Sequence, residues 1–354
     1  MASPTERNPG ADVSRRQPGA ERPLVALAMG DPAGIGPELA ARLLVSPSVR
    51  AAARLVVVGD RRIMEAGAAT AGLSVDIDDV HDEGLPLTED QALIDLHNLD
   101  PAGIVPGEAT PAGGRFAVQA FTRALRLAHS GRVDAVCYTP FNKKAMRHAH
   151  PGYDDESRFI SELLRVEGRV REFNVLDTVW NARVTSHIPL KDVAASLSKQ
   201  AIIAEIVFTV ECLQQAGVRA PRLMVAGLNP HAGDSGSFGS EEIEIIAPAV
   251  EAAAARGIAV TGPYPADTVF VAALKTGCHA VLTMYHDQGQ IAMKLMGFDR
   301  GVTLLGGLPF PVCTPAHGTA YDIAGKGIAN PRASEEAVLL AARMATLRPY
   351  DPTE

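Results

Sequence analysis

Short apolar runs alternate along the chain with longer segments in which apolar residues recur every three or four positions. The short runs are bounded by Gly, Pro, Asn and Asp, which is typical of buried strands, whereas the longer segments indicate amphipathic helices. Strands are predicted at residues 24–29, 55–58, 135–138, 175–176, 182–185, 223–228, 280–284 and 301–305. Helices are predicted at residues 37–44, 116–128, 158–164, 199–216, 241–255 and 334–345. This alternation predicts an α/β fold with a mainly parallel sheet.

Two stretches depart from the alternation. Residues 76–114 are rich in Pro and Gly and poorly periodic, so we expect loops there, with an edge hairpin. The first 21 residues are rich in Pro, Gly, Arg and Ser and lack the apolar core of a secretory signal. We therefore predict a disordered tail over residues 1–21.

Composition narrows the class of protein. The chain has 354 residues, of which 47% are hydrophobic and 21% charged, enough for two domains or one large one with a substantial core. A net charge of −8 without a long basic run disfavours a nucleic-acid or anionic-membrane partner. No stretch reaches the roughly 18 apolar residues of a membrane span. The four scattered cysteines favour reduced thiols in a cytoplasmic protein.

Three histidines follow predicted strands in turn-like settings. They are His187 in Val-Thr-Ser-His-Ile-Pro, His231 in Gly-Leu-Asn-Pro-His-Ala-Gly and His286 in Met-Tyr-His-Asp-Gln. In open α/β sheets the ligand site lies beyond the carboxyl ends of the strands. Three imidazoles there would form a facial set for one divalent cation and leave positions open for substrate. The alternative is three unrelated histidines, because no pair has the short spacing of a local metal motif.

Other polar residues lie in similar places. Asn142 and Lys143 follow the predicted strand at 135–138, where a lysine would bind an anionic group or transfer protons, or simply be solvated. Asp267 and Asp287 are near the candidate histidines in sequence and would orient an imidazole or take a proton.

Two glycine-rich segments are candidate ligand loops. Residues 30–38, Gly-Asp-Pro-Ala-Gly-Ile-Gly-Pro-Glu, join a strand to a helix and form either a tight turn or an anion site. Residues 317–330 carry Asp322, whose carboxylate would accept hydrogen bonds from an adenosine ribose.

Together these segments resemble the 4-hydroxythreonine-4-phosphate dehydrogenase family over about residues 24–345. The specific matches are residues 30–38, 229–233 (Asn-Pro-His-Ala-Gly), 265–268 (Pro-Ala-Asp-Thr), 285–289 (Tyr-His-Asp-Gln-Gly) and 317–320 (His-Gly-Thr-Ala). The resemblance implies an isocitrate/isopropylmalate dehydrogenase-like fold with two α/β/α domains flanking an active-site cleft. We expect a cofactor-side domain from residues 22–140 plus 306–354, and a dimerisation and metal-site domain from residues 141–305.

The resemblance also implies cofactors, partners and roles. It implies a homodimer that binds a divalent metal through His187, His231 and His286, zinc first, with Mg, Mn or Co as alternatives. It implies NAD as the cofactor, because Asp322 matches the carboxylate that selects NAD over NADP. The cofactor-binding residues would be His317, Gly318, Thr319, Ala320, Asp322, Ile323 and Asn330. Lys143, Asp267 and Asp287 would be the catalytic residues that handle protons.

At the substrate end the chain departs from the family pattern. The family's substrate-contacting His-Thr pair is Glu156-Ser157 here, and two of its three phosphate-binding residues, an Asn and an Arg, are Thr303 and Val312. Losing an arginine removes a bidentate, permanently charged partner for phosphate. The expected substrate-binding residues are Asn142, Glu156, Ser157, Lys294, Arg300 and Thr303.

We therefore expect oxidative decarboxylation of a hydroxy acid or carboxylated dihydrodiol that bears no phosphate. The first alternative is a dehydrogenase of a four-carbon sugar-acid 4-phosphate or of 4-phosphohydroxy-threonine. The second is a protein of another class, either a phosphate acyltransferase or a non-catalytic binder.

Overall fold

A computed structural model describes residues 22–85, 89–176 and 179–347 of the chain. The predicted tail over residues 1–21 lies outside the described residues.

The described strands form one sheet in the order β3-β4-β2-β1-β5-β12-β11-β6-β7-β10-β8-β9. Their bounds are β1 Leu24–Ala28, β2 Arg54–Gly59, β3 Asp78–Asp79, β4 Gln91–Asp95, β5 Ala135–Tyr138, β6 Arg171–Leu176, β7 Val179–Arg183, β8 Arg222–Ala226, β9 Ala259–Tyr264, β10 Ala280–Thr283, β11 Val302–Gly306 and β12 Val312–Pro315. Pairing is parallel except for β11 with β12, β11 with β6, and β6 with β7. The predicted mainly parallel α/β fold is therefore confirmed.

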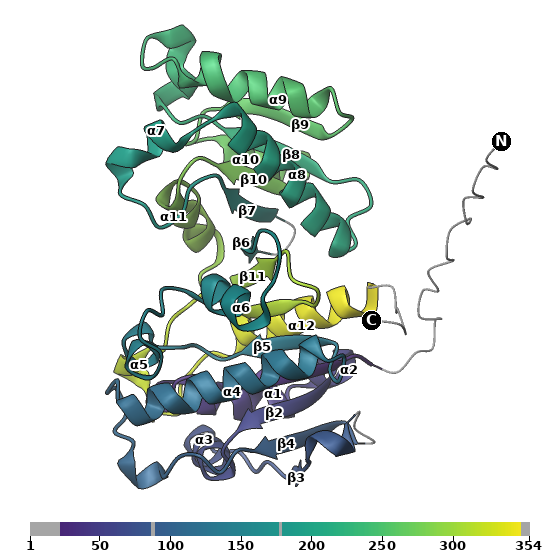
Figure 1. Cartoon of the computed structure of the whole chain (residues 1–354), viewed down its shortest axis with the longest axis vertical. Helices are drawn as coiled ribbons and strands as arrows, with labels where there is room; N and C mark the ends of the chain where they lie inside the picture. Colours follow the sequence, from purple (N-terminus) through teal and green to yellow (C-terminus); the bar gives the residue numbers. More distant parts are fainter. Residues whose placement is uncertain (1–21, 86–88, 177–178, 348–354) are drawn as a thin grey trace, which may run out of the picture.

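Helices cover both parts of this sheet. They are α1 Gly36–Val45, α2 Pro47–Ala52, α3 Arg61–Ala71, α4 Pro111–His129, α5 Lys143–Ala149, α6 Glu156–Leu164, α7 Val193–Ser196, α8 Lys199–Gln215, α9 Ala247–Ala254, α10 Val269–Thr276, α11 His286–Gly297 and α12 Arg332–Leu347. Figure 1 shows one half built on β1–β5 with α1–α4 and α12, and another built on β7–β10 with α8–α11, with β6 and β11 between them. The antiparallel strands therefore join two α/β halves into one sheet.

The helices form because apolar residues recur on one face, and several begin at side-chain caps. Asp60, Thr110, Asn142, Asp155 and Ser198 accept a backbone N–H in the first turn of α3, α4, α5, α6 and α8 respectively. Strand β1 is buried along its whole length, as expected for a central parallel strand covered on both faces.

The edge of the sheet differs from the prediction. Residues 76–114 hold β3 and β4 at the sheet edge, but these strands pair in parallel, so they are not a hairpin. The described part of the stretch also holds two short 3-10 helices, Asp82–Gly84 and Pro101–Gly103, and α4 begins inside it at Pro111.

The four cysteines, Cys137, Cys212, Cys278 and Cys313, are buried and unpaired, as predicted. Among the described residues no single helix is long and apolar enough to cross a bilayer. One pair, Leu190–Ser196 with Lys199–Gln215, meets the length and composition criteria jointly but is bent by 95°.

Candidate active site

The three candidate histidines follow three neighbouring strands. Strand β10 pairs in parallel with β7 on one side and β8 on the other. His187 lies four residues after β7, His286 directly follows the turn after β10, and His231 lies five residues after β8. The parallel pairing therefore brings the three histidine-bearing loops to one edge of the sheet, as predicted.

Hydrogen bonds join these loops. The hydroxyl of Thr185, two residues before His187, donates to the Met284 carbonyl at 2.7 Å. The Gln288 side chain accepts from the Met284 N–H at 2.7 Å and donates to the Gly227 carbonyl at 2.8 Å. The loop after β10 is therefore tied to both of its neighbours.

His187 and His286 lie close together, with ring centroids 5.7 Å apart. His286 Nδ1 lies 2.7 Å from Asp287 Oδ1, and His187 Nδ1 lies 3.8 Å from Asp155 Oδ2. Metal-binding histidines commonly have a carboxylate at the ring nitrogen that does not face the metal. Asp287 is therefore placed where it would orient the His286 ring.

His231 lies in an unusual stretch of backbone. Five successive residues, His231 to Ser235, have φ between +42° and +84°. A non-glycine residue in the left-handed region costs roughly 1–2 kcal/mol, and strain of this kind is concentrated at functional sites. The His231 ring contacts Phe238, with centroids 6.0 Å apart.

In residues 22–85, 89–176 and 179–347, no group of three His, Cys, Asp or Glu side chains is close enough to hold a metal. The structure brings His187 and His286 together, and the three-histidine site as a whole stays a prediction.

A second group of polar residues surrounds the start of α5 and α6. The Asn142 side chain caps α5, and Lys143 is its first residue. Tyr153 donates a hydrogen bond to Glu156 Oε1 at 2.9 Å. Burial raises the pKa of Glu156 above its usual value, and the nearby Lys143 charge partly offsets this. Lys143 thus lies near a carboxyl group, that of Glu156, whose pKa is above the usual value for glutamate.

A cavity of about 430 Å³ opens between α6, β6 and β7. Ser157, Asp155, Arg183 and His187 are among the residues that line it. It therefore joins the predicted substrate residue Ser157 to a predicted metal ligand.

Arg183, one of the residues that line this cavity, is buried and was not among the residues predicted from the sequence. Arg183 donates to Ser186 Oγ at 3.0 Å, Asn174 Oδ1 at 2.7 Å and Glu172 Oε2 at 2.7 Å. Burial lowers the pKa of Arg183, and the charge of Glu172 opposes that shift. The signal in the sequence was a charged residue inside an apolar strand, directly before the His187 motif.

The other predicted site residues are dispersed. Lys294 is exposed on α11, and Arg300 donates to the Met296 carbonyl at 3.3 Å. Thr303 is half-buried on β11. Asp267 is exposed in the turn before α10, and in the described part of the chain no hydrogen bond or ion pair joins it to the three histidines.

The position of Val312 bears on the substrate. Val312 is fully buried, in the core between β5 and β11. Its side chain therefore does not line an open pocket in this structure.

The predicted cofactor loop, residues 317–330, packs on the turn of residues 30–38. The Ile35 N–H donates to the Thr319 carbonyl at 3.0 Å, and the Tyr321 hydroxyl donates to Asp31. The Ala329 N–H donates to buried Glu38 at 2.9 Å. Segments nearly 300 residues apart in sequence thus form one unit.

Within this loop, Asp322, Gly318 and Asn330 are exposed, whereas Thr319 is buried. Burial lowers the pKa of His317, whose Nδ1 lies 3.0 Å from the Gly318 carbonyl. Ile323 and Ala320 pack on a small cluster with Ile35. An exposed carboxylate at 322 remains available to a ribose.

The turn of residues 30–38 serves packing rather than anion binding. A Cβ at Gly30 would lie 2.2 Å from the Thr139 carbonyl oxygen, and one at Gly34 would lie 2.8 Å from that of Thr319. Buried Glu38 occupies the first turn of α1, where a bound anion would be repelled. Of the two readings left open by the sequence, the structure favours the tight turn.

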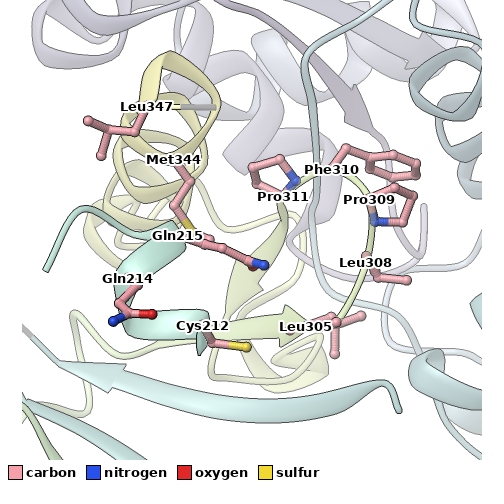
Figure 2. A pocket seen from close by; sticks show the side chains of 12 residues that line it. Cys212, Gln214, Gln215, Leu305, Leu308, Pro309, Phe310, Pro311, Met344 and Leu347 are labelled. Carbon is pink, nitrogen blue, oxygen red and sulfur yellow. The ribbon is translucent and has the colours of Figure 1, made fainter. Parts of the chain in front are cut away.

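Another cavity, of about 470 Å³, is shown in Figure 2. It lies between the end of α8, α12 and the β11–β12 connection, and it is lined mainly by apolar side chains such as Leu308, Phe310 and Met344. None of the predicted site residues lines it, so we place the candidate active site at the histidine edge.

Comparison with known proteins shows the family to which the chain is similar. The family described as pyridoxal phosphate biosynthetic protein PdxA matches residues 51–341. A Rhizobium meliloti (strain 1021) protein named "Putative 4-hydroxythreonine-4-phosphate dehydrogenase 2" is 62% identical over 95% of this chain and 96% of its own length. A Symbiobacterium thermophilum protein named "Putative D-threonate 4-phosphate dehydrogenase" is 37% identical over 92% of this chain and 97% of its own.

A solved structure gives the same result for the fold. The crystal structure of 4-hydroxythreonine-4-phosphate dehydrogenase from Klebsiella pneumoniae aligns with a TM-score of 0.80 and 35% identity. The alignment covers 93% of this chain and 100% of that one. The fold expected from the resemblance is confirmed.

Proposed function

The chain belongs to the pyridoxal phosphate biosynthetic protein PdxA family, and we propose from this premise that it is an NAD- and divalent-metal-dependent dehydrogenase. Its substrate would be a four-carbon hydroxy acid carrying a 4-phosphate, of the 4-hydroxythreonine or threonate type. The observation that carries the proposal is the 62% identity, over nearly the whole length, to a relative named for that reaction.

The preference for a substrate without phosphate finds no support in the relatives, whose names specify phosphorylated substrates. The reason for the error lies partly in Val312. Its identity was taken as evidence of a changed pocket, but its side chain lies in the core between β5 and β11. A side chain buried in the core cannot contact a bound phosphate, so the identity of residue 312 does not indicate whether the substrate carries one.

His187, His231 and His286 would hold the metal. Asp287, 2.7 Å from His286 Nδ1, would fix the orientation of that ring, and the charge of Asp155 lies 3.8 Å from His187 Nδ1. A bound divalent cation would polarise the substrate hydroxyl and lower its pKa. We propose zinc first, because three imidazole ligands with an open position suit it.

Residues 317–330 would hold NAD. Asp322 is exposed and placed to accept hydrogen bonds from the adenosine ribose. The remaining proposed contacts are His317, Gly318, Thr319, Ala320, Ile323 and Asn330. The bonds from Ile35 to Thr319 and from Tyr321 to Asp31 hold this loop in one position before NAD arrives.

Lys143 and Glu156 are the proposed proton carriers. The raised pKa of Glu156 lets its carboxyl bind and release protons closer to neutral pH than an ordinary glutamate. Ser157 and Asn142 would contact the substrate, and Lys294 would neutralise part of its phosphate charge. Arg300, Thr303 and Asp267 stay as proposed site residues.

We further propose that oxidation is followed by decarboxylation. Bound NAD would accept the hydride of the carbinol carbon, and the hydroxyl proton would pass to the protein. With the new ketone β to a carboxylate, the bond between the carboxylate and the α-carbon would break, carbon dioxide would leave, and the resulting enolate would take up a proton from the protein.

A homodimer fits the surface of α11. Ile291, Leu295 and Phe298 recur at helical spacing and are 62%, 84% and 58% exposed. A stripe of large apolar side chains of this kind is typical of an interface. The proposed dimerisation domain, residues 141–305, contains it, and residues 22–140 plus 306–354 form the proposed cofactor-side domain. The buried free thiols suit a cytoplasmic location.

The test is NAD reduction by metal-replete protein, followed by NADH absorbance, with 4-phosphohydroxy-threonine and threonate 4-phosphate as substrates. The proposal requires turnover of at least one of them, loss of turnover after chelation, and its return with Zn²⁺, Mn²⁺ or Co²⁺. Binding of NAD and metal without turnover of any hydroxy acid would favour a non-catalytic binder instead.

A further inference from the structure

The His231 loop, which we define as residues 227–239, adopts a backbone that its own sequence does not favour. Four of the five successive left-handed residues have side chains, and only Gly233 is a glycine. L-residues rarely adopt this conformation in succession. Contacts from outside the left-handed stretch must therefore hold it.

The buried carboxylate of Glu242 supplies those contacts. Its side chain is almost fully enclosed, with the residue 3% exposed. Glu242 Oε1 accepts the backbone N–H groups of Leu228 at 2.7 Å and Asn229 at 2.8 Å, and Oε2 accepts from Asn229 Nδ2 at 2.9 Å. Hydrogen bonds to an ionised carboxylate are stronger than neutral ones. All three fix the chain immediately before His231.

Glycines make room for this carboxylate. A Cβ at Gly227 would lie 2.9 Å from Glu242 Oε1, and one at Gly233 would lie 2.8 Å from Oε2. Glycines on both sides of His231 thus allow the backbone to close around Glu242. The chain here is shaped to enclose the carboxylate.

The segment that carries Glu242 is itself irregular. Residues Glu242–Ile246 form a π-helical turn that leads into α9. Single π-helical turns are frequent at functional sites. The same loop is tied at Gly227 to Gln288, two residues after His286. Glu242 therefore binds the His231 loop close to the residue where this loop contacts the loop that carries His286.

We propose that Glu242 is the positioning residue for His231: it does not touch the metal but holds the loop that presents the imidazole at the same edge of the sheet as His187 and His286. This inference rests on the metal-dependent function proposed above. The proposed role of the carboxylate is geometric, so its loss would weaken metal binding in a protein that remains folded.

The experiment compares variants of the full-length protein, stripped of metal with a chelator and titrated with Co²⁺, whose visible absorption reports its ligands. E242Q keeps the shape of the side chain but sets an amide against the Asn229 amide. E244Q, an exposed position in the same π-helical turn, is the matched control. His231→Ala defines the loss of the ligand itself.

We expect E242Q to weaken Co²⁺ affinity about 10- to 100-fold, as for other residues that orient metal ligands. Its Co²⁺ spectrum should move toward that of His231→Ala, while E244Q matches the unmodified protein. Circular dichroism of each variant establishes that it is folded. Asn229→Ala removes the side-chain bonds to Glu242 Oε2 and Glu241 Oε2 but leaves both backbone bonds to Glu242 Oε1. It should give a smaller loss of affinity and serves as the second variant where E242Q does not fold.

Two results would overturn the proposal, and they are distinguishable. If the unmodified protein binds Co²⁺ and folded E242Q binds it equally with the same spectrum, Glu242 has no positioning role and the dehydrogenase proposal stands. If the unmodified protein binds no divalent cation, the metal-dependent function fails and the role of Glu242 fails with it.

Discussion

Replacing Tyr321 by phenylalanine tests the contact between the cofactor loop and the first turn of the fold. The Tyr321 hydroxyl donates to Asp31, which is 1% exposed. Burial raises the pKa of Asp31, and the bond from Tyr321 lowers it. Without the hydroxyl, one oxygen of a buried carboxylate loses its charge-assisted partner. The expected cost is about 1.5–3 kcal/mol at neutral pH.

The pH dependence of this cost follows from the direction of the shift. The folded pKa of Asp31 lies above the unfolded value of 3.8, so folded protein binds the proton more tightly. Stability therefore falls as pH rises between the two values, and it is constant above the folded pKa. Tyr321→Phe raises the folded pKa further and extends this fall to higher pH. The variant should be least destabilised in acid and most destabilised above the raised pKa.

The assay is thermal unfolding of both proteins near pH 4, close to the unfolded pKa of Asp31 of 3.8, and at pH 8. In a chain of this size the cost corresponds to a fall in Tm of about 2–4 °C at pH 8, with a smaller fall near pH 4. In an Asp31→Asn background, Tyr321→Phe should cost little, because no charge is then left without a partner. Equal destabilisation at both pH values, or an undiminished cost beside Asp31→Asn, would refute the reasoning.

Three further predictions concern the cofactor, the proton carrier and the buried ion pair. Gly34→Ala sets a Cβ 2.8 Å from Thr319 in the proposed cofactor loop. Initial-rate measurements should show the KM for NAD raised about tenfold, equivalent to about 1.4 kcal/mol. An unchanged KM would argue against cofactor binding by residues 317–330. Glu156→Gln should remove the acid limb from the pH profile of kcat/KM. In the unmodified protein, Glu156 becomes protonated as the pH falls through its pKa, which burial has raised. An acid limb that persists in the variant would belong to another group. Arg183→Met should lower the free energy of unfolding by about 3–5 kcal/mol in denaturant titrations, because it leaves partly buried Glu172 without its partner. Adding Glu172→Met should restore much of that loss. A double variant whose loss equals the sum of the two single losses would contradict a coupled pair.

Local patterns in the sequence were sufficient for the strands that position the site. The runs before His187, His231 and His286 became β7, β8 and β10, because short apolar segments bounded by turn residues can be buried only as strands here. Helix α11 was missed, since its first residue is His286 itself and its exposed Ile291 and Leu295 interrupt the polar face expected of a solvated helix.

The rest of the site depends on contacts between distant residues. Arg183 meets Glu172 across two antiparallel strands, and Glu242 meets Leu228 across a loop of left-handed backbone. No local pattern in the sequence encodes such pairs. The left-handed backbone conformation of His231 cannot be predicted without the distant residues that hold it. The edge strands β3 and β4 illustrate the same limit, because their parallel pairing depends on the neighbouring strand β2 rather than on a turn.

The most direct test of the proposed function compares one substrate with and without its phosphate. NADH formation by metal-replete protein is measured with threonate 4-phosphate and with threonate, and with the corresponding hydroxythreonine pair. We predict kcat/KM at least roughly a hundredfold higher for a phosphorylated acid, as expected for two charged hydrogen bonds to the phosphate. Equal turnover of the two forms, or a preference for the acid without phosphate, would contradict the proposed substrate class.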